Sequence, residues 1–281
     1  MNRTSMTRVV VFLAFLLGPV GGDVACVHLP RFPEVRALTH ADVDARLRAA
    51  AARRRAVDGV AKAALPGLSG AVLNATVDIA AAAPDRLSVA VRSFFEVPQQ
   101  ILVATADGVT LYDATSGAPR FLRGPATDRS LARVLGVPLA PDDAIALVLG
   151  RAPLDVVPGR PPPRVRLVAV DEDGGTYTAR IERPGRGALL VTARVTDDAI
   201  VAAEVWRGDG RPLVRARCAD FVAQDGVAFA RRIELALVDD DAGIRPAEVV
   251  LSITKATWNP PALPDSAFVL DVPDGITVQP L

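Results

Sequence analysis

The fold is decided by residues 84–113, which read PDRLSVAVRSFFEVPQQILVATADGVTLYD. Leu87, Val89 and Val91 alternate with small or polar residues, so in an extended chain they lie on one face. This period-two pattern is typical of a strand with one buried side. Asp107-Gly108 is a typical tight hairpin turn between two such runs. The stretch therefore predicts three successive antiparallel strands, over 86–94, 100–106 and 109–113.

The same pattern continues on both sides of this stretch. Turn-forming segments such as Asp173-Gly174-Gly175 separate the runs. Further strands are predicted over 73–79, 164–171, 176–183, 189–196, 200–207, 212–221, 227–238 and 248–256. Two short helices, over 128–135 and 141–149, interrupt the series, and Asp142 and Asp143 lie in the first turn of the second. The sequence therefore predicts a mainly β fold with a few helices.

A longer helix is predicted before the strands. Thr39 is a suitable N-cap, with Asp42 three residues later, and the helical pattern runs to Arg55. The final run Arg53-Arg54-Arg55 complements the negative end of the helix dipole. We interpret this run as a solvated helix end.

The stretch 157–163, VPGRPPP, resembles a linker inside the body of the chain. The strands predicted after it repeat the style of those before it. We therefore expect residues 39–281 to form one domain.

Residues 1–25 are interpreted as a signal peptide. Arg3 and Arg8 form a positively charged segment before an apolar run over 9–17, VVVFLAFLL, which is too short to cross a bilayer. Val24-Ala25-Cys26 resembles the bacterial lipobox, which implies that Cys26 is acylated and becomes the new N-terminus. The alternative is secretory cleavage nearby, with Cys26 free or removed. Residues 26–38 contain two prolines and are predicted to form a tether.

The composition offers little for catalysis or nucleic-acid binding. Lys plus Arg equals Asp plus Glu at 32 each, so no net charge attracts nucleic acid. The two histidines, His28 and His40, lie in the tether and at a helix start, away from the predicted strands. Gly67-Leu68-Ser69-Gly70 misses the nucleophile elbow by one position. We expect no catalytic residue, metal site or cofactor, and we expect Cys218 to be a buried apolar residue.

Two groups of motifs carry a resemblance to a known family. Pro84-Asp85-Arg86-Leu87, the apolar loop after it and the returning hairpin 107–113 resemble the corresponding part of the LolB lipoprotein receptor. The ending, with Trp258-Asn259-Pro260-Pro261 and Val272-Pro273-Asp274-Gly275, resembles the close of LolA-like domains. The resemblance covers most of 39–281 and implies an open antiparallel β-barrel, or half-barrel, capped by helices.

The resemblance implies a membrane-contact loop at Phe94, Phe95, Val97 and Pro98. Two adjacent aromatic residues cannot both point inward from a regular strand, so one ring is exposed or the strand bends. The alternative is a bulged strand end with both rings in the core.

The resemblance also implies a ligand cavity lined by one face of the sheet. The alternation selects as its lining Leu87, Val89, Val91, Leu111, Val205, Ile233, Leu235, Leu251 and Ile253. The alternative is that these residues fill a closed core, as in most small barrels.

The function implied by the resemblance is that of an exported lipoprotein, anchored in the outer membrane and facing the periplasm. Its partners would be membrane lipid or lipoprotein acyl chains, and envelope proteins. The alternative is a structural or accessory envelope lipoprotein with a packed core and protein partners.

Overall fold

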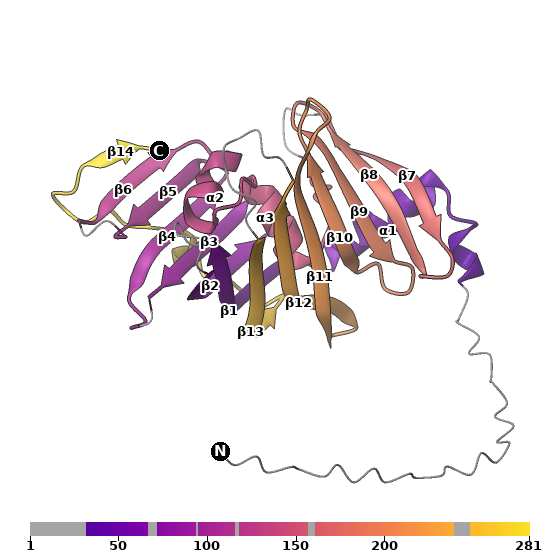
Figure 1. Ribbon diagram of the computed structural model, residues 1–281, viewed down its shortest axis with the longest axis horizontal. Helices are drawn as coiled ribbons and strands as arrows, with labels where there is room; N and C mark the ends of the chain where they lie inside the picture. Colours follow the sequence, from indigo (N-terminus) through magenta and orange to yellow (C-terminus); the bar gives the residue numbers. More distant parts are fainter. Residues whose placement is uncertain (1–31, 67–71, 94, 116–117, 157–160, 239–247) are drawn as a thin grey trace, which may run out of the picture. The chain divides into compact units, whose positions relative to one another are not determined.

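One twisted sheet forms the framework of the computed structural model (Figure 1). The structure describes residues 32–66, 72–93, 95–115, 118–156, 161–238 and 248–281. Within these residues the strands are β1 (Ala56–Pro66), β2 (Val72–Ala82), β3 (Arg86–Arg92), β4 (Pro98–Thr105), β5 (Gly108–Asp113), β6 (Arg120–Gly124), β7 (Arg164–Asp171), β8 (Thr176–Arg183), β9 (Gly187–Arg194), β10 (Ile200–Trp206), β11 (Pro212–Gln224), β12 (Val227–Leu237), β13 (Glu248–Trp258) and β14 (Val278–Pro280). Their order in the sheet is β14-β6-β5-β4-β3-β2-β1-β13-β12-β11-β10-β9-β8-β7.

The sheet has two free edges, β14 and β7, which do not pair with each other. Neighbouring strands are antiparallel except for β14 and β6, which are parallel. The sheet is therefore open and does not close into a barrel. This confirms the predicted mainly β fold with an open half-barrel.

Within the described residues three α-helices pack on the sheet: α1 (His40–Ala52), α2 (Asp128–Leu135) and α3 (Pro141–Leu149). In addition, η1 (Pro33–Val35) and η3 (Asp265–Phe268) are short 3-10 helices. Contacts join α1 to β7, α2 to β4, and α3 to β2, β3 and β12. We call the face of the sheet that α3 covers the inner face; it carries most of the buried apolar side chains. The predicted helices 128–135 and 141–149 thus form, and they cover the core.

The strand β1 was not predicted, because its sequence AVDGVAKAALP is rich in residues with low β-propensity. Its pairing with β2 and β13 nevertheless places Val57, Ala61 and Ala63 in the core. Gly59 is needed where β1 approaches β13, since a Cβ atom there would lie 2.6 Å from the Lys255 carbonyl oxygen. Tertiary contact, not local preference, explains this strand.

The helix α1 begins as predicted and ends earlier than predicted. Thr39 and Asp42 form a capping box, in which each side chain bonds the other residue's backbone N–H. The helix ends at Ala52, and Arg54 beyond it is fully buried. The interpretation of residues 53–55 as a solvated helix end is therefore wrong for Arg54.

The Arg54 guanidinium is buried because it satisfies backbone carbonyls from three segments. It donates to the carbonyl oxygens of Ala50 at 3.2 Å, Asp197 at 3.4 Å and Ala228 at 3.3 Å. The carbonyls at a helix C-terminus lack partners within the helix, so a cation there is favourable. Arg54 thereby joins the end of α1 to the 197 turn and to β12.

Part of the predicted tether packs against the domain. Val35 is fully buried, Phe32 and Leu38 contact the core, and the Phe32 N–H donates to the Glu172 carbonyl at 3.1 Å. Residues 26–31 lie outside the described residues, so the tether remains a prediction for that part alone.

The chain after β13 crosses the outer face of the sheet. Phe268 packs there against Ala82 and Val103, and the Arg86 guanidinium carbon lies 4.8 Å from the centre of the Phe268 ring. Cys218 is buried in the core, and burial raises its thiol pKa to about 12. No helix among the described residues is long and apolar enough to cross a membrane.

Arg54→Met should lower the free energy of unfolding by about 3 kcal/mol, because it leaves buried carbonyls without their donor. Urea unfolding followed by circular dichroism measures this. Arg53→Met is the matched control, since Arg53 is exposed and should change stability little. Equal losses in the two variants would contradict this role for Arg54.

Candidate functional site

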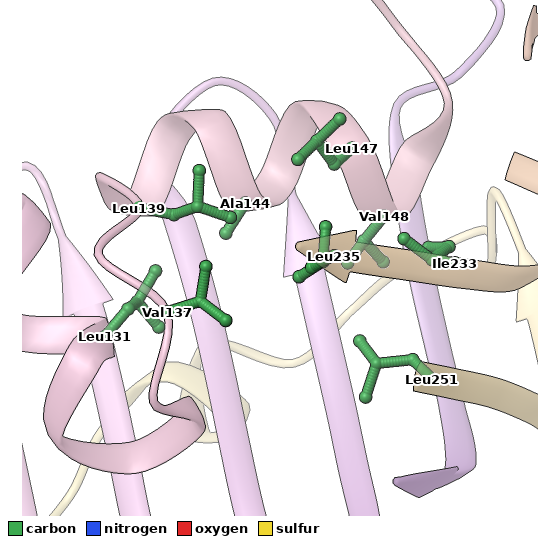
Figure 2. Close-up of a pocket in the computed structure, with 9 residues that line it drawn as sticks. All are labelled: Leu131, Val137, Leu139, Ala144, Leu147, Val148, Ile233, Leu235 and Leu251. Atoms are coloured by element: carbon green, nitrogen blue, oxygen red, sulfur yellow. The ribbon is translucent and has the colours of Figure 1, made fainter. Parts of the chain in front are cut away.

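An apolar cavity lies between helices α2 and α3 and the inner face of the sheet (Figure 2). Its walls are Leu131 from α2, Val137 and Leu139 from the segment between the helices, Ala144, Leu147 and Val148 from α3, Ile233 and Leu235 from β12, and Leu251 from β13. No polar side chain is among these residues, so the cavity offers water no hydrogen-bond partner there. The cavity suits an apolar ligand.

The floor of the cavity is set by the register of two strands. Ile233 on β12 is the cross-strand partner of Leu251 on β13, so the two side chains lie next to each other on the inner face. Leu235 lies two residues further along β12 and therefore points to the same side. Figure 2 shows these side chains opposite Val148 and Ala144 of α3.

Three of the nine predicted lining residues, Ile233, Leu235 and Leu251, line this cavity. The other six are buried in the same core but do not line it: Leu87, Val89, Val91, Leu111, Val205 and Ile253. The wall supplied by α2, α3 and the segment between them was missed. The signal for it was present, since residues 141–149 are apolar on almost every side after the first turn.

The cavity is small in this structure. Its volume is about 30 Å³, whereas pockets for small ligands usually measure about 300–1,000 Å³. An acyl chain cannot enter unless the walls move apart. β12 and β13 are fixed by the hydrogen bonds of the sheet, whereas α2 and α3 meet them through side chains.

Two ion pairs hold α3 in place, and we call them the α3 latch: Asp143 with Arg183, and Asp142 with Arg186. The first pair is bidentate and buried on both sides. In the second, an Arg186 guanidinium nitrogen donates to Asp142 at 2.6 Å. Burial raises the pKa of Asp143 above its ordinary value, and the adjacent Arg183 opposes this shift. The latch ties the first turn of α3 to the end of β8 and the turn that follows.

The contacts of α3 also show that the sheet is curved. β8 lies seven strand spacings from β2, which is about 34 Å in a flat sheet. The nine residues of α3 span only about 13 Å, yet α3 contacts β2 and also pairs with Arg183 on β8. The sheet must therefore bend around α3, which places the cavity inside the bend.

The predicted membrane-contact loop lies between β3 and β4. Phe95 is 82% exposed and Val97 is 53% exposed, and Pro98 is also exposed. The Ser93 N–H donates to the Val97 carbonyl at 2.9 Å and closes the loop. Phe94 lies outside the described residues. The alternative with both rings in the core does not hold for Phe95.

The acidic residue in this loop, Glu96, is paired with an arginine at the base of the loop. Glu96 has a left-handed φ of 60° and accepts from Arg92 at 2.5 Å. Arg92 also donates to Asp78 on β2 at 2.5 Å. The charge of Glu96 is thus paired toward the base of the loop, while Phe95 and Val97 stay exposed.

The other predicted sites lie outside this cavity. Cys26, the predicted lipid attachment site, lies outside the described residues. Among the residues that the structure describes, no group of three or more His, Cys, Asp or Glu side chains is placed to hold a metal ion.

Three solved structures share the fold of this chain. A LolA superfamily protein from Nitrosomonas europaea has 17% identity and a TM-score of 0.56, covering 83% of this chain and 98% of its own. A DUF1329 family protein from Desulfovibrio piger has 11% identity and a TM-score of 0.55, covering 84% and 97%. A domain named for outer membrane lipoprotein sorting, from Vibrio parahaemolyticus, has 11% identity and a TM-score of 0.53, covering 79% and 93%.

No protein-family model matches the sequence, and no curated protein sequence matches it. The structural likeness shows that the chain has a LolA-like fold, as the sequence motifs predicted.

Arg183→Met should lower the free energy of unfolding by about 3–5 kcal/mol, because it leaves the Asp143 carboxylate buried without its partner. The double variant Asp143→Leu/Arg183→Met should recover most of this loss, since neither charge remains. Thermal and urea unfolding measure both. A double variant as unstable as the single one would contradict a coupled pair.

The loss in Arg183→Met should also depend on pH. A carboxyl whose folded-state pKa is raised favours folding below its unfolded pKa and loses that contribution as pH rises through the folded pKa. The single variant should therefore be closer in stability to the double variant at about pH 4 than at about pH 8. A gap that does not change with pH would show that Asp143 stays ionised.

Proposed function

We propose that this chain is an envelope lipoprotein that binds an acyl chain, of a lipid or of another lipoprotein, between the α2–α3 segment and the inner face of the sheet. The observation that carries the proposal is the apolar cavity at that place, enclosed by two helices on a curved sheet. We propose a binding role without catalysis for this domain.

The chemistry of the cavity supports an acyl ligand. A hydrocarbon chain gains about 0.8 kcal/mol for each CH₂ group that leaves water, and the nine wall residues offer it apolar contact alone. The cavity is too small for an acyl chain, so binding would displace α2 and α3 and expose the inner face. Contacts between the ligand and the walls must therefore offset the free energy of the contacts that α3 loses with β12, and a long chain offers enough apolar surface to do so.

The exposed loop supports contact with a membrane. Phe95 and Val97 form an apolar tip on a short hairpin between β3 and β4, and exposed apolar side chains grouped in this way mark membrane or protein contacts. We propose that Phe94, Phe95, Val97 and Pro98 enter the lipid surface from which an acyl chain is taken or to which it is delivered.

The anchor and the location complete the proposal. We propose that residues 1–25 are removed, that Cys26 is acylated, and that the domain is held at the outer membrane facing the periplasm. Two or more acyl chains on one cysteine would make such an anchor stable. The name of the Vibrio parahaemolyticus neighbour is consistent with an envelope location.

A second candidate function rests on the small size of the cavity. At about 30 Å³ the interior is nearly filled by the chain's own side chains, as in a domain that carries no ligand. In this case the chain would be an accessory envelope lipoprotein that acts through protein partners.

Ala144→Phe should weaken binding of a fluorescent long-chain fatty acid by about tenfold or more, because the ring occupies the cavity from the α3 side. The protein used should carry Cys26→Ser, so that its own anchor does not compete. Ala132→Phe is the matched control, since Ala132 lies on α2 outside the cavity walls and should leave binding unchanged.

Two results would favour the accessory role. The first is that the unsubstituted domain neither binds the fatty acid nor retains lipid detectable by mass spectrometry after purification. The second is that Ala144→Phe binds as well as the unsubstituted domain. Unfolding curves show whether each variant is folded, since overpacking costs about 1–3 kcal/mol.

Phe95→Ser/Val97→Ser should reduce co-flotation with vesicles of phosphatidylethanolamine and phosphatidylglycerol, again in the Cys26→Ser background. The melting temperature should not fall, because both side chains are exposed. Val269→Ser is the control, because Val269 lies outside this loop and is 56% exposed, close to the 53% of Val97. Equal flotation of the loop variant and the control would contradict the membrane contact.

A further inference from the structure

The two edges of the sheet differ in how they are protected. β14 has three residues, and Pro280 within it has no backbone N–H. β7 has eight residues, with a β-bulge between Leu167 and Ala169, and its regular part runs from Arg164 to Leu167. Among the residues that the structure describes, no strand pairs with its outer side. An unpaired regular edge is a template for an added strand.

The register of β7 shows which backbone groups face outward. The Leu167 N–H donates to His40 Nδ1 at 3.0 Å, so it points away from β8. Because outward groups recur every second residue, the N–H and C=O of Val165 face the same way. Within the described residues no hydrogen bond to these two groups of Val165 is present. One outward N–H of β7 is thus covered by a side chain, and another is open.

A groove of about 470 Å³ runs beside this part of β7. One wall is the strand itself, with Pro163, Arg164, Val165 and Arg166, and with Glu182 of β8. The opposite wall is α1, where His40, Asp44 and Arg48 recur every fourth residue and therefore lie on one side of the helix.

The charges in the groove favour one kind of occupant. Asp44 is paired with Arg48 at 3.0 Å, and Glu182 lies 3.7 Å from Arg180. Arg164 and Arg166 are exposed and have no ion pair within the part of the chain that is described. The acidic groups are thus engaged while two cations on β7 are not. An acidic partner satisfies them, whereas a second β7 strand would bring four arginines together.

We propose that an extended acidic peptide segment of another protein binds as an additional strand along the β7 edge, in the groove between β7 and α1. Its backbone pairs with Val165, and with Leu167 once His40 turns aside. Its carboxylates pair with Arg164 and Arg166. This surface is separate from the apolar cavity, so the proposal does not depend on acyl-chain binding.

The probe is a synthetic peptide of eight residues in which Glu alternates with Val or Thr, labelled for fluorescence anisotropy and added to the mature-length protein with Cys26→Ser. The expected result is saturable binding that Arg164→Glu/Arg166→Glu weakens by about tenfold or more. Arg217→Glu is the matched control, since Arg217 is an exposed arginine on β11, and it should leave binding unchanged.

A second peptide distinguishes strand addition from simple charge attraction. It has the same sequence with N-methyl groups on alternate residues, which removes the N–H groups of one edge and keeps every charge. It should bind at least about tenfold more weakly, and hydrogen exchange at Val165 should slow only with the unmethylated peptide. Equal binding of the two peptides would overturn the proposal.

Two other outcomes would assign the groove to a different occupant and would also overturn the proposal. If the peptide binds only after residues before Phe32 are removed, the chain's own N-terminal segment fills the groove. If the protein self-associates with rising concentration and Arg164→Glu/Arg166→Glu changes this, the occupant is a second copy.

Discussion

The buried ion pair between Asp143 and Arg183 is the constraint on which the site depends. It joins the first turn of a nine-residue helix to the end of β8, while the body of that helix packs on β2, β3 and β12. Strands this far apart in the sheet can meet one short helix only if the sheet bends. The pair therefore requires a curved sheet, and it holds the first turn of α3 beside the apolar space beneath the helix.

A buried ion pair is a poor source of net stability, because desolvation of both charges offsets their attraction. Its geometric effect is greater. The pair acts at one end of α3, whereas Ala144, Leu147 and Val148 supply apolar contact further along the helix. An acyl chain can replace apolar contact but offers nothing to Asp143. The structure thus combines a polar attachment at the first turn of α3 with an apolar underside further along the helix, whose contacts a hydrocarbon can replace.

Much of the fold could be predicted because the local signals agree with the tertiary structure. Alternation gave most strands from 73 onward, and the capping residues Thr39 and Asp42 gave the start of α1. β1 escaped prediction because Ala and Gly carry little strand preference, and pairing on both sides supplies what the residues lack. β14 is three residues long and pairs with a strand more than 150 positions earlier in the chain, so no local sequence pattern predicts it.

The site was less predictable than the fold, for physical reasons. Strand alternation identifies which residues face inward, but all nine predicted lining residues do so and only three meet the cavity. The position of α3 determines which three residues line the cavity. That position depends on the pairing of Asp143 with Arg183, forty residues away. Arg54 likewise reads as one of three arginines at a helix end, and only its contact with β12 and the 197 turn explains its burial.

Movement of the helices away from the sheet when an acyl chain binds can be measured directly. Spin labels at cysteines introduced for Arg133 on α2 and Arg217 on β11, both exposed, report the separation by pulsed electron resonance. Cys218 is buried with a raised thiol pKa, so it should react poorly with the label. The distance should be longer when a long-chain fatty acid is bound. A distance that stays the same while binding is shown independently would contradict this movement.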